Sequence, residues 1–110
     1  MISNKRIVVY FFVLLIAVWF FKITINDGNS MAPTLFSGQV CLVVKCVEPL
    51  PGDIVYAYDN EGVGVCKRLA WYTKNGEMFL IGDNAKNSLD SRHLGPVPMS
   101  AYIGKVAFCP

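Results

Sequence analysis

The sequence is poor in the residues and spacings on which many enzyme classes depend. It has 110 residues, of which 16% are charged, and it contains a single histidine, His93. The four cysteines include no C-x-x-C pair, and no G-x-x-x-x-G-K-[ST] segment occurs. Zinc sites and P-loop nucleotide sites use such patterns. We therefore expect no metal, nucleotide or other cofactor. His93, in a polar loop beside Arg92, is a poor candidate for Ser-His-Asp or Cys-His catalysis.

Excess charge of one sign is also scarce. Ten Lys and Arg residues face eight Asp and Glu residues, for a net charge of +2. Three of these bases and one acid precede Gly28, so seven bases and seven acids follow it. A neutral body offers no basic face, and the sequence thus predicts no nucleic-acid partner. With 54% hydrophobic residues, the chain is not disordered either.

What the sequence does have is a long hydrophobic run near its N-terminus. Residues 7–21 read IVVYFFVLLIAVWFF, Lys22 interrupts the run, and Ile25 ends it. If Lys22 reaches to the interface, residues 7–25 are long enough to span a bilayer. Lys5 and Arg6 then place residues 1–6 in the cytoplasm by the positive-inside rule. We expect a transmembrane anchor at 7–25, with the lipid bilayer as partner. Residues 26–110 would lie on the extracytoplasmic face of an inner or plasma membrane.

Two other interpretations of this run are weaker. A cleavable signal peptide also has a basic start and an apolar centre, but no small-x-small cleavage site follows in KITINDGNS. A buried core helix would not be apolar on every face in so small a domain. The uncleaved anchor is therefore favoured.

The remaining sequence is typical of strands and turns. Asn75-Gly76 is a strong hairpin signal, and no helical periodicity appears beyond the anchor. The prediction is a mostly-β fold, in which an N-terminal transmembrane helix precedes a small antiparallel β-sheet domain. The predicted strands are 39–47, 53–58, 63–72, 77–81 and 101–108, and a further strand can start at 24–26.

The four cysteines allow two interpretations. Outside the cytoplasm they can form disulfides. Cys41 and Cys46 are an odd number of residues apart, so on one regular strand they face opposite sides and cannot pair with each other. Small buried hydrophobic side chains are slightly favoured for all four, including Cys66 and Cys109.

A serine hydrolase without a catalytic histidine needs another base. Lysine can serve where an apolar setting without a nearby carboxylate lowers its pKa. Lys67 interrupts the strand VGVCKRLAWY and has apolar residues around it. It can equally be an outward-facing charge, and Arg68 must then face the other side. Ser30 lies in GNSMAPTL, a few residues beyond the apolar run, and is by itself an ordinary turn serine.

Four segments together resemble, in the same order, the conserved boxes of type I signal peptidases. These are the S26 family of Ser/Lys membrane proteases. GNSMAPTL with Gly38 resembles the serine box, PGDIV the next, and CKRLA the lysine box. GDNAKNSLDSRHLGPVP fills the last pattern, G-D-N-x-x-N-S-x-D-S-R-x-x-G-x-V, throughout. The resemblance covers most of residues 28–98.

The resemblance implies roles for particular residues. Ser30 matches the nucleophile, Lys67 its general base, and Ser88 the serine whose hydroxyl orients the lysine. The Ser30 N–H would form part of the oxyanion hole. The positions implied to contact substrate are Met31, Leu35, Gly64, Val65 and Cys66, the last three in a strand that pairs with an extended substrate. The positions implied to form ion pairs are Arg68 with Asp83 and Asp90 with Arg92.

By this resemblance the protein is a membrane serine endopeptidase with a signal peptidase I type catalytic domain. It would cleave signal peptides from translocated preproteins, with small side chains, typically Ala, at the first and third positions before the cut. Only residues 71–81 separate the last two boxes, so the chain resembles a short form without the large inserted domain of some bacterial members.

Two features depart from the family pattern: the Gly-x-Pro-Gly-Asp segment that follows the lysine box in the family is absent, and Gly28 replaces a serine. Gly28 stands where some members carry an oxyanion-hole serine, so a backbone N–H or a water would have to replace that donor. Two alternative functions stay open. One is a dedicated processing peptidase of the same family, of pilin, conjugation or mitochondrial inner-membrane type. The other is a non-catalytic membrane-anchored binding module.

Overall fold

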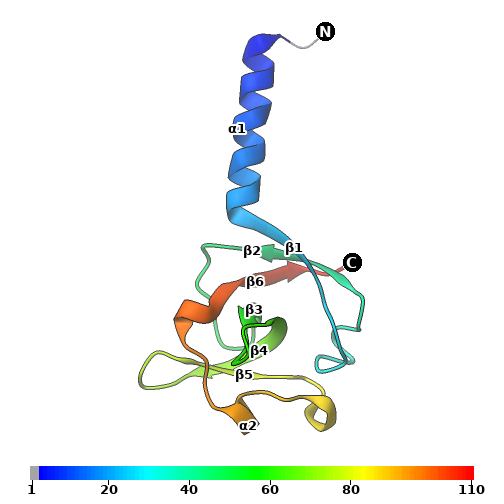
Figure 1. Ribbon diagram of the computed structural model, residues 1–110, viewed down its shortest axis with the longest axis vertical. Helices are drawn as coiled ribbons and strands as arrows, with labels where there is room; N and C mark the ends of the chain where they lie inside the picture. Colours follow the sequence, from blue (N-terminus) through cyan, green and yellow to red (C-terminus); the bar gives the residue numbers. More distant parts are fainter. Residues whose placement is uncertain (1–2) are drawn as a thin grey trace.

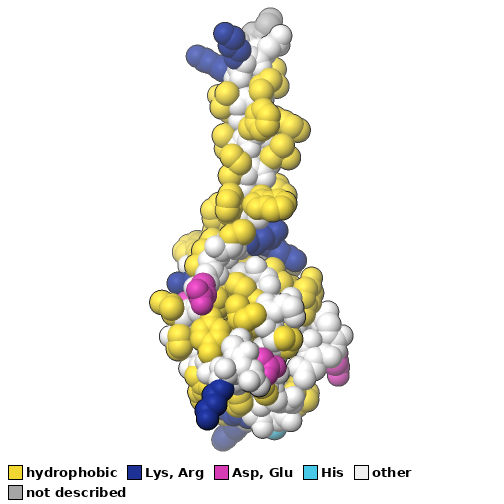
Figure 2. Space-filling view, turned by 90° about the vertical axis from the view of Figure 1, so that its left-hand side faces the viewer, with side chains coloured by type: hydrophobic (Ala, Val, Ile, Leu, Met, Phe, Trp, Pro, Cys, Tyr) yellow, Lys and Arg dark blue, Asp and Glu magenta, His cyan; other side chains and the backbone are white. Residues whose placement is uncertain are grey.

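The computed structural model describes residues 3–110 of the chain. Its first element, helix α1 (Asn4–Phe20), projects from one end of a β domain (Figure 1). Ser3 caps the helix, because its side chain accepts a hydrogen bond of 3.3 Å from the Arg6 N–H. No residue of α1 is buried, and apolar side chains cover the face of the helix seen in Figure 2.

The helix is shorter than the membrane anchor predicted from the sequence. It ends at Phe20, and Phe21–Ile25 form strand β1. This strand pairs antiparallel with β2 (Val40–Val44), and the β-branched side chains at its end favour an extended backbone. Within residues 3–110, no helix combines the length and hydrophobicity that crossing a membrane requires. The prediction of a transmembrane helix over residues 7–25 is therefore not supported.

The predicted antiparallel sheet is confirmed. The strand order is β1-β2-β6-β3-β4-β5, and every pairing is antiparallel. The other strands are β3 (Ile54–Tyr58), β4 (Gly64–Tyr72), β5 (Met78–Ile81) and β6 (Tyr102–Phe108). Three short helical segments that carried no periodic signal also form: η1 (Ala85–Asn87), α2 (Ser91–Leu94) and η2 (Met99–Ala101). The first two lie in the last sequence box, at the end of the domain away from α1 (Figure 1).

Two buried clusters hold the domain together, and β4 contributes to both. Leu69 of β4 belongs to the first cluster and Cys66 to the second. Because side chains alternate along a strand, the intervening Lys67 faces the same side as Leu69. The first cluster also contains Val55, Ala57, Met78, Leu80 and Val97. The second also contains Met31, Leu35 and Cys41.

The expectation that all four cysteines are simple buried side chains is wrong for three of them, Cys41, Cys46 and Cys109. Cys41 and Cys109 form a disulfide across 68 residues of sequence. The pairing of β2 with β6 brings them together, since Leu42 lies opposite Phe108. Cys66 is a buried free thiol, as expected, whereas Cys46 is free and exposed.

Candidate active site

The loop between β1 and β2 carries Ser30, and the last sequence box holds its backbone. The Asn84 N–H donates to the Ser30 carbonyl oxygen at 2.8 Å, and Asn84 Nδ2 donates to the Asn29 carbonyl oxygen at 3.0 Å. Met31, the next residue, is completely buried beneath the loop. Ser30 itself is half-buried.

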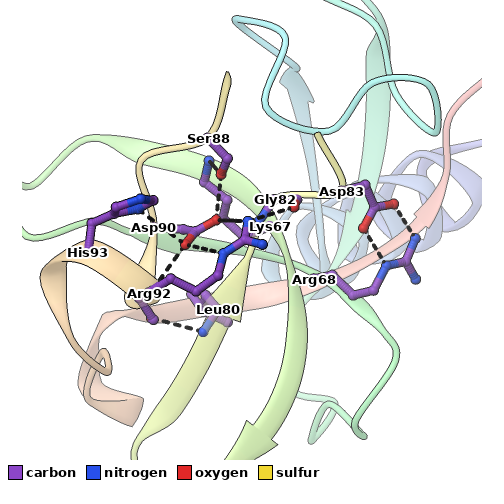
Figure 3. Close-up of polar contacts among 10 residues, drawn as sticks. Lys67, Arg68, Leu80, Gly82, Asp83, Ser88, Asp90, Arg92 and His93 are labelled. Carbon is purple, nitrogen blue, oxygen red and sulfur yellow. Dashed lines mark hydrogen bonds and ion pairs between the residues drawn. The ribbon is translucent and has the colours of Figure 1, made fainter. Parts of the chain in front are cut away.

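Lys67 lies at one end of a chain of hydrogen-bonded side chains that continues through Ser88 to Asp90. Its side chain extends from β4 and only 7% of the residue is exposed. Lys67 Nζ donates to Ser88 Oγ at 3.3 Å, and Ser88 Oγ donates to Asp90 Oδ2 at 2.6 Å (Figure 3). The structure therefore brings together the predicted base and the serine predicted to orient it.

Asp90 is the centre of this network. It caps α2 and accepts hydrogen bonds from the Gly82 N–H at 2.8 Å and from Arg92 Nη2 at 2.7 Å. Burial by itself would raise the pKa of Asp90. The hydrogen bonds from Arg92, Gly82 and Ser88 outweigh burial and hold this pKa well below its usual range. Asp90 is thus an ionised carboxylate whose charge is already compensated.

Burial lowers the pKa of Lys67 below its ordinary value. The charges of Asp90 and Asp59 oppose this shift, and Arg92 adds to it. The sequence-based argument required a lysine without a nearby carboxylate. The Asp90 carboxylate lies close enough to act on Lys67, so this condition is not met. The lysine pKa falls nonetheless, because burial is the largest contribution. A lowered pKa leaves more of the amine unprotonated, which is the form that acts as a base.

Besides the Arg92–Asp90 pair, a second ion pair joins β4 to the last sequence box, on the side of β4 opposite Lys67. Arg68 Nε and Nη2 donate to the two carboxylate oxygens of Asp83 at 2.8 and 2.7 Å (Figure 3). Arg68 Nη1 also donates to the Gly52 carbonyl oxygen at 2.6 Å, in the PGDIV segment. Thr34 Oγ1 donates to Asp83 Oδ2 at 2.5 Å. All four sequence boxes therefore meet at one network, and Thr34 is a member that the sequence analysis did not single out.

Gly82 is the place where the serine loop approaches the lysine network. A Cβ added to Gly82 would overlap both Ser88 Oγ and the Ser30 carbonyl oxygen. The absence of a side chain at this position lets the two serine-bearing segments pack against each other. Within residues 3–110, however, no hydrogen bond joins Ser30 Oγ to Lys67 Nζ, and the side-chain hydrogen bond of the lysine goes to Ser88 Oγ.

The positions expected to contact substrate separate into two groups. Met31, Leu35 and Cys66 lie together in a buried cluster. Gly64 and Val65 are half-buried at the start of β4. There β3 pairs with one edge of β4, whereas β5 pairs with the other edge only from Arg68 onward. In the described part of the chain, the second edge of residues 64–67 therefore has no partner strand.

Gly28 stands at the position where an oxyanion-hole donor side chain was considered, and glycine has no such side chain. It adopts a positive φ of 85°, which glycine tolerates, and its N–H donates to Ser37 Oγ at 3.1 Å. The Ser30 N–H is a hydrogen-bond donor in the same loop. Among residues 3–110, no group of three His, Cys, Asp or Glu side chains is arranged to hold a metal ion.

Comparison with known proteins relates the chain to one family. A family model described as signal peptidase, peptidase S26, matches residues 69–109. The chain is 30% identical over 110 residues to mitochondrial inner membrane protease subunit 1 of Xenopus tropicalis, an alignment that covers 77% of the chain and 66% of that relative. The same subunit of Schizosaccharomyces pombe is 30% identical over 113 residues, covering 80% and 72%. Signal peptidase I of Buchnera aphidicola is 50% identical over 38 residues, covering 34% and 12%.

Proposed function

The chain belongs to the S26 signal peptidase family, and from this premise we propose that it is a membrane-associated Ser/Lys endopeptidase. Its proposed reaction is the removal of N-terminal signal peptides from translocated preproteins after small residues. The observation that carries the proposal is the buried Lys67, whose amine has a lowered pKa and is positioned by Ser88. A lysine of this kind is the base that a serine hydrolase without a catalytic histidine requires.

The proposed reaction has two balanced halves. Neutral Lys67 takes the proton from Ser30 Oγ as that oxygen attacks the scissile carbonyl carbon. Lys67 then gives the proton to the leaving amine, and the carbon–nitrogen bond breaks to leave an acyl ester on Ser30. In the second half, a water loses a proton to Lys67 and its oxygen attacks the ester carbon. Lys67 then gives this proton to Ser30 Oγ as the ester carbon–oxygen bond breaks, which restores Ser30 and neutral Lys67. The signal peptide leaves as a carboxylic acid that loses its remaining proton to solvent. The Ser30 N–H is proposed to stabilise the oxyanion in both halves.

Ser30 Oγ and Lys67 Nζ must come into hydrogen-bond contact for the first transfer. Such contacts are often long in a free enzyme and shorten when substrate binds. The unpaired edge of β4 at residues 64–67 is the proposed binding strand, because an extended peptide can add there as a further strand. Val65 and Cys66 would then direct neighbouring substrate side chains to opposite faces of the sheet.

The proposed membrane association rests on α1. Its large apolar side chains, from Ile7 to Phe20, are between 40% and 70% exposed, and no residue of the helix is buried. So much apolar surface on one element marks a site of interaction, and we propose that lipid covers it. The test is flotation of the full chain with liposomes, in which recovery of the protein at the bottom of the gradient would contradict the proposal.

A dedicated processing peptidase is the second candidate function. The mitochondrial protease subunits align along 77% and 80% of this chain, whereas the bacterial signal peptidase I aligns along 34%. A panel of unrelated preproteins distinguishes the two candidates. Cleavage of most of the panel would exclude the dedicated function, and cleavage of one substrate would exclude the general one.

The decisive experiment is cleavage of a preprotein with an Ala-x-Ala signal site in detergent or liposomes. We expect the wild type to cleave it and both Ser30→Ala and Lys67→Ala to lose activity by at least ~100-fold. Ser100→Ala and Lys74→Ala, which change exposed residues elsewhere, are the matched controls. Equal activity in Ser30→Ala and the wild type would exclude the Ser/Lys mechanism. A folded wild type that binds the panel without cleaving any member would support the non-catalytic module.

A further inference from the structure

A small apolar cavity lies beside Lys67 and has no part in the mechanism described so far. Its volume is about 20 Å³, which is room for little more than one water-sized or methyl-sized group. Lys67 forms one wall, and apolar side chains form most of the rest: Val65, Leu80, Leu89, Leu94 and Val97. Asp59 and Asn60 stand at the same cavity.

The walls of this cavity are fixed relative to one another. Asn60 Nδ2 donates to the Leu94 carbonyl oxygen at 3.3 Å, which ties the turn after β3 to the end of α2. The N-terminus of α2 is in turn capped by Asp90, and Ser91 Oγ accepts a hydrogen bond of 2.9 Å from the Leu80 N–H of β5. The cavity therefore has a built shape, and a larger occupant would have to displace these contacts.

The position of Lys67 identifies the part of a substrate that reaches this cavity. In the proposed reaction, Lys67 gives a proton to the amine released from the scissile bond. That nitrogen belongs to the residue that follows the cut, so the side chain of this residue is one carbon away from the atom that Lys67 must touch. Three of the five positions implied to contact substrate, Met31, Leu35 and Cys66, lie in the other buried cluster. Val65, another of the five, lines the cavity beside Lys67.

We propose that the cavity beside Lys67 is the specificity pocket for the residue that follows the scissile bond and that it selects a small, uncharged side chain there. The inference rests on the proposed function and extends it to the leaving-group side of the substrate. Alanine or serine fits a cavity of about 20 Å³, whereas leucine or phenylalanine meets Leu89 and Leu94. Aspartate would bring a negative charge to an apolar cavity that also borders Asp59 and Asp90.

The test is a set of preprotein substrates that share an Ala-x-Ala site and differ only in the residue after the cut. With purified full-length enzyme, we expect kcat/KM to fall by ~10-fold or more from alanine to leucine and to phenylalanine. Leu89→Ala and Leu94→Ala enlarge the cavity and should reduce the difference between alanine and leucine to less than about threefold. Both side chains are partly exposed, at 65% and 43%, so the variants are expected to fold.

Leu50→Ala is the matched control, because Leu50 is 66% exposed and lies outside the cavity. It should retain the selectivity of the wild type. Equal kcat/KM across the substrate set, or unchanged selectivity in both cavity variants, would overturn the inference while leaving the proposed function in place. Failure of the wild type to cleave the alanine substrate would overturn the proposed function, and this inference with it.

Discussion

Cys66 and Lys67 are neighbours on β4, both are buried, and they face opposite sides of the sheet. Burial raises the pKa of the Cys66 thiol to about 11 and lowers the pKa of the Lys67 amine. Each shift favours the uncharged form, because burial penalises whichever form carries charge. For the thiol, the uncharged form is unreactive, whereas for the amine it is the base. The same physical cause thus leaves one side chain inert and prepares the other for proton transfer.

The surroundings of Cys66 and Lys67 also differ. Cys66 lies among Met31, Leu35 and the disulfide-bonded Cys41, a purely apolar cluster. Lys67 shares its face of β4 with an apolar cluster but ends at Ser88 and the compensated carboxylate of Asp90. We therefore expect substitutions in the cluster around Cys66 to lower stability. We expect substitutions of Lys67 and of the polar residues around its amine to lower catalytic activity.

The largest expected effect is that of Lys67→Arg. The guanidinium retains the positive charge but cannot lose its proton near neutrality, so it cannot act as a base. We expect kcat/KM to fall by at least ~100-fold. Lys67→Met, which keeps the apolar stem and removes the amine, should be equally inactive, and thermal melts establish whether each variant is folded.

Lys74→Arg is the matched control, because Lys74 is exposed in the turn between β4 and β5. It should retain the activity of the wild type. A folded Lys67→Arg enzyme with wild-type activity would show that Lys67 is not the base. The proposed contrast between Cys66 and Lys67 would then be wrong, and another group would carry out the proton transfer.

The next effect concerns the Cys66 side of the sheet. Cys109→Ser removes the disulfide to Cys41, which links residues 68 positions apart. Losing the restraint on the unfolded chain should lower the free energy of unfolding by about 2–5 kcal/mol. Chemical denaturation measures this loss, and wild type in reductant should match the variant. Cys46→Ser, which changes an exposed free cysteine, is the control and should leave stability unchanged. Equal stability of Cys109→Ser and the wild type would show that this side does not depend on the disulfide.

Much of the β domain could be predicted from local sequence. The alternating, β-branched segments around residues 40–44, 54–58 and 64–72 predicted their strands because period-2 patterning is a local signal. The end of α1 at Phe20 could not be predicted in this way. An apolar run is compatible with both helix and strand, and only pairing with β2 gives residues 21–25 an extended structure. The Cys41–Cys109 disulfide escaped prediction for the same reason, since it depends on which distant strands become neighbours.

The candidate site divides along a similar line. The motifs placed Lys67, Ser88 and Asp90 in boxes that the structure brings into one hydrogen-bonded chain. Asp59 carried no signal beyond its place in a turn, and its nearness to Lys67 arises only when β3 and β4 pair. The burial of Met31 and Leu35 could not be predicted either, because a motif specifies residue types and says nothing about their exposure.

The smallest expected effect tests how charge adjusts the lysine. Burial lowers the pKa of Lys67 most and Arg92 lowers it further, whereas the charges of Asp90 and Asp59 raise it. Activity requires unprotonated Lys67 and so rises with pH through this pKa, which lies below the ordinary value near 10.4. Asp59→Asn keeps an oxygen that can accept the Glu61 and Val63 N–H groups but removes the charge. The midpoint of the pH–rate profile should therefore move to lower pH.

The direction of this shift separates two ways in which Asp59 can matter. If its charge acts on Lys67, Asp59→Asn raises activity below the midpoint and leaves the plateau at high pH unchanged, because all of the lysine is unprotonated there. If Asp59 serves only to fold its turn, the variant changes stability and the midpoint stays in place. Glu61→Gln, which removes an exposed charge from the same turn, should leave the midpoint unchanged. A midpoint that moves to higher pH in Asp59→Asn would contradict the electrostatic account and would require another group to be the titrating base.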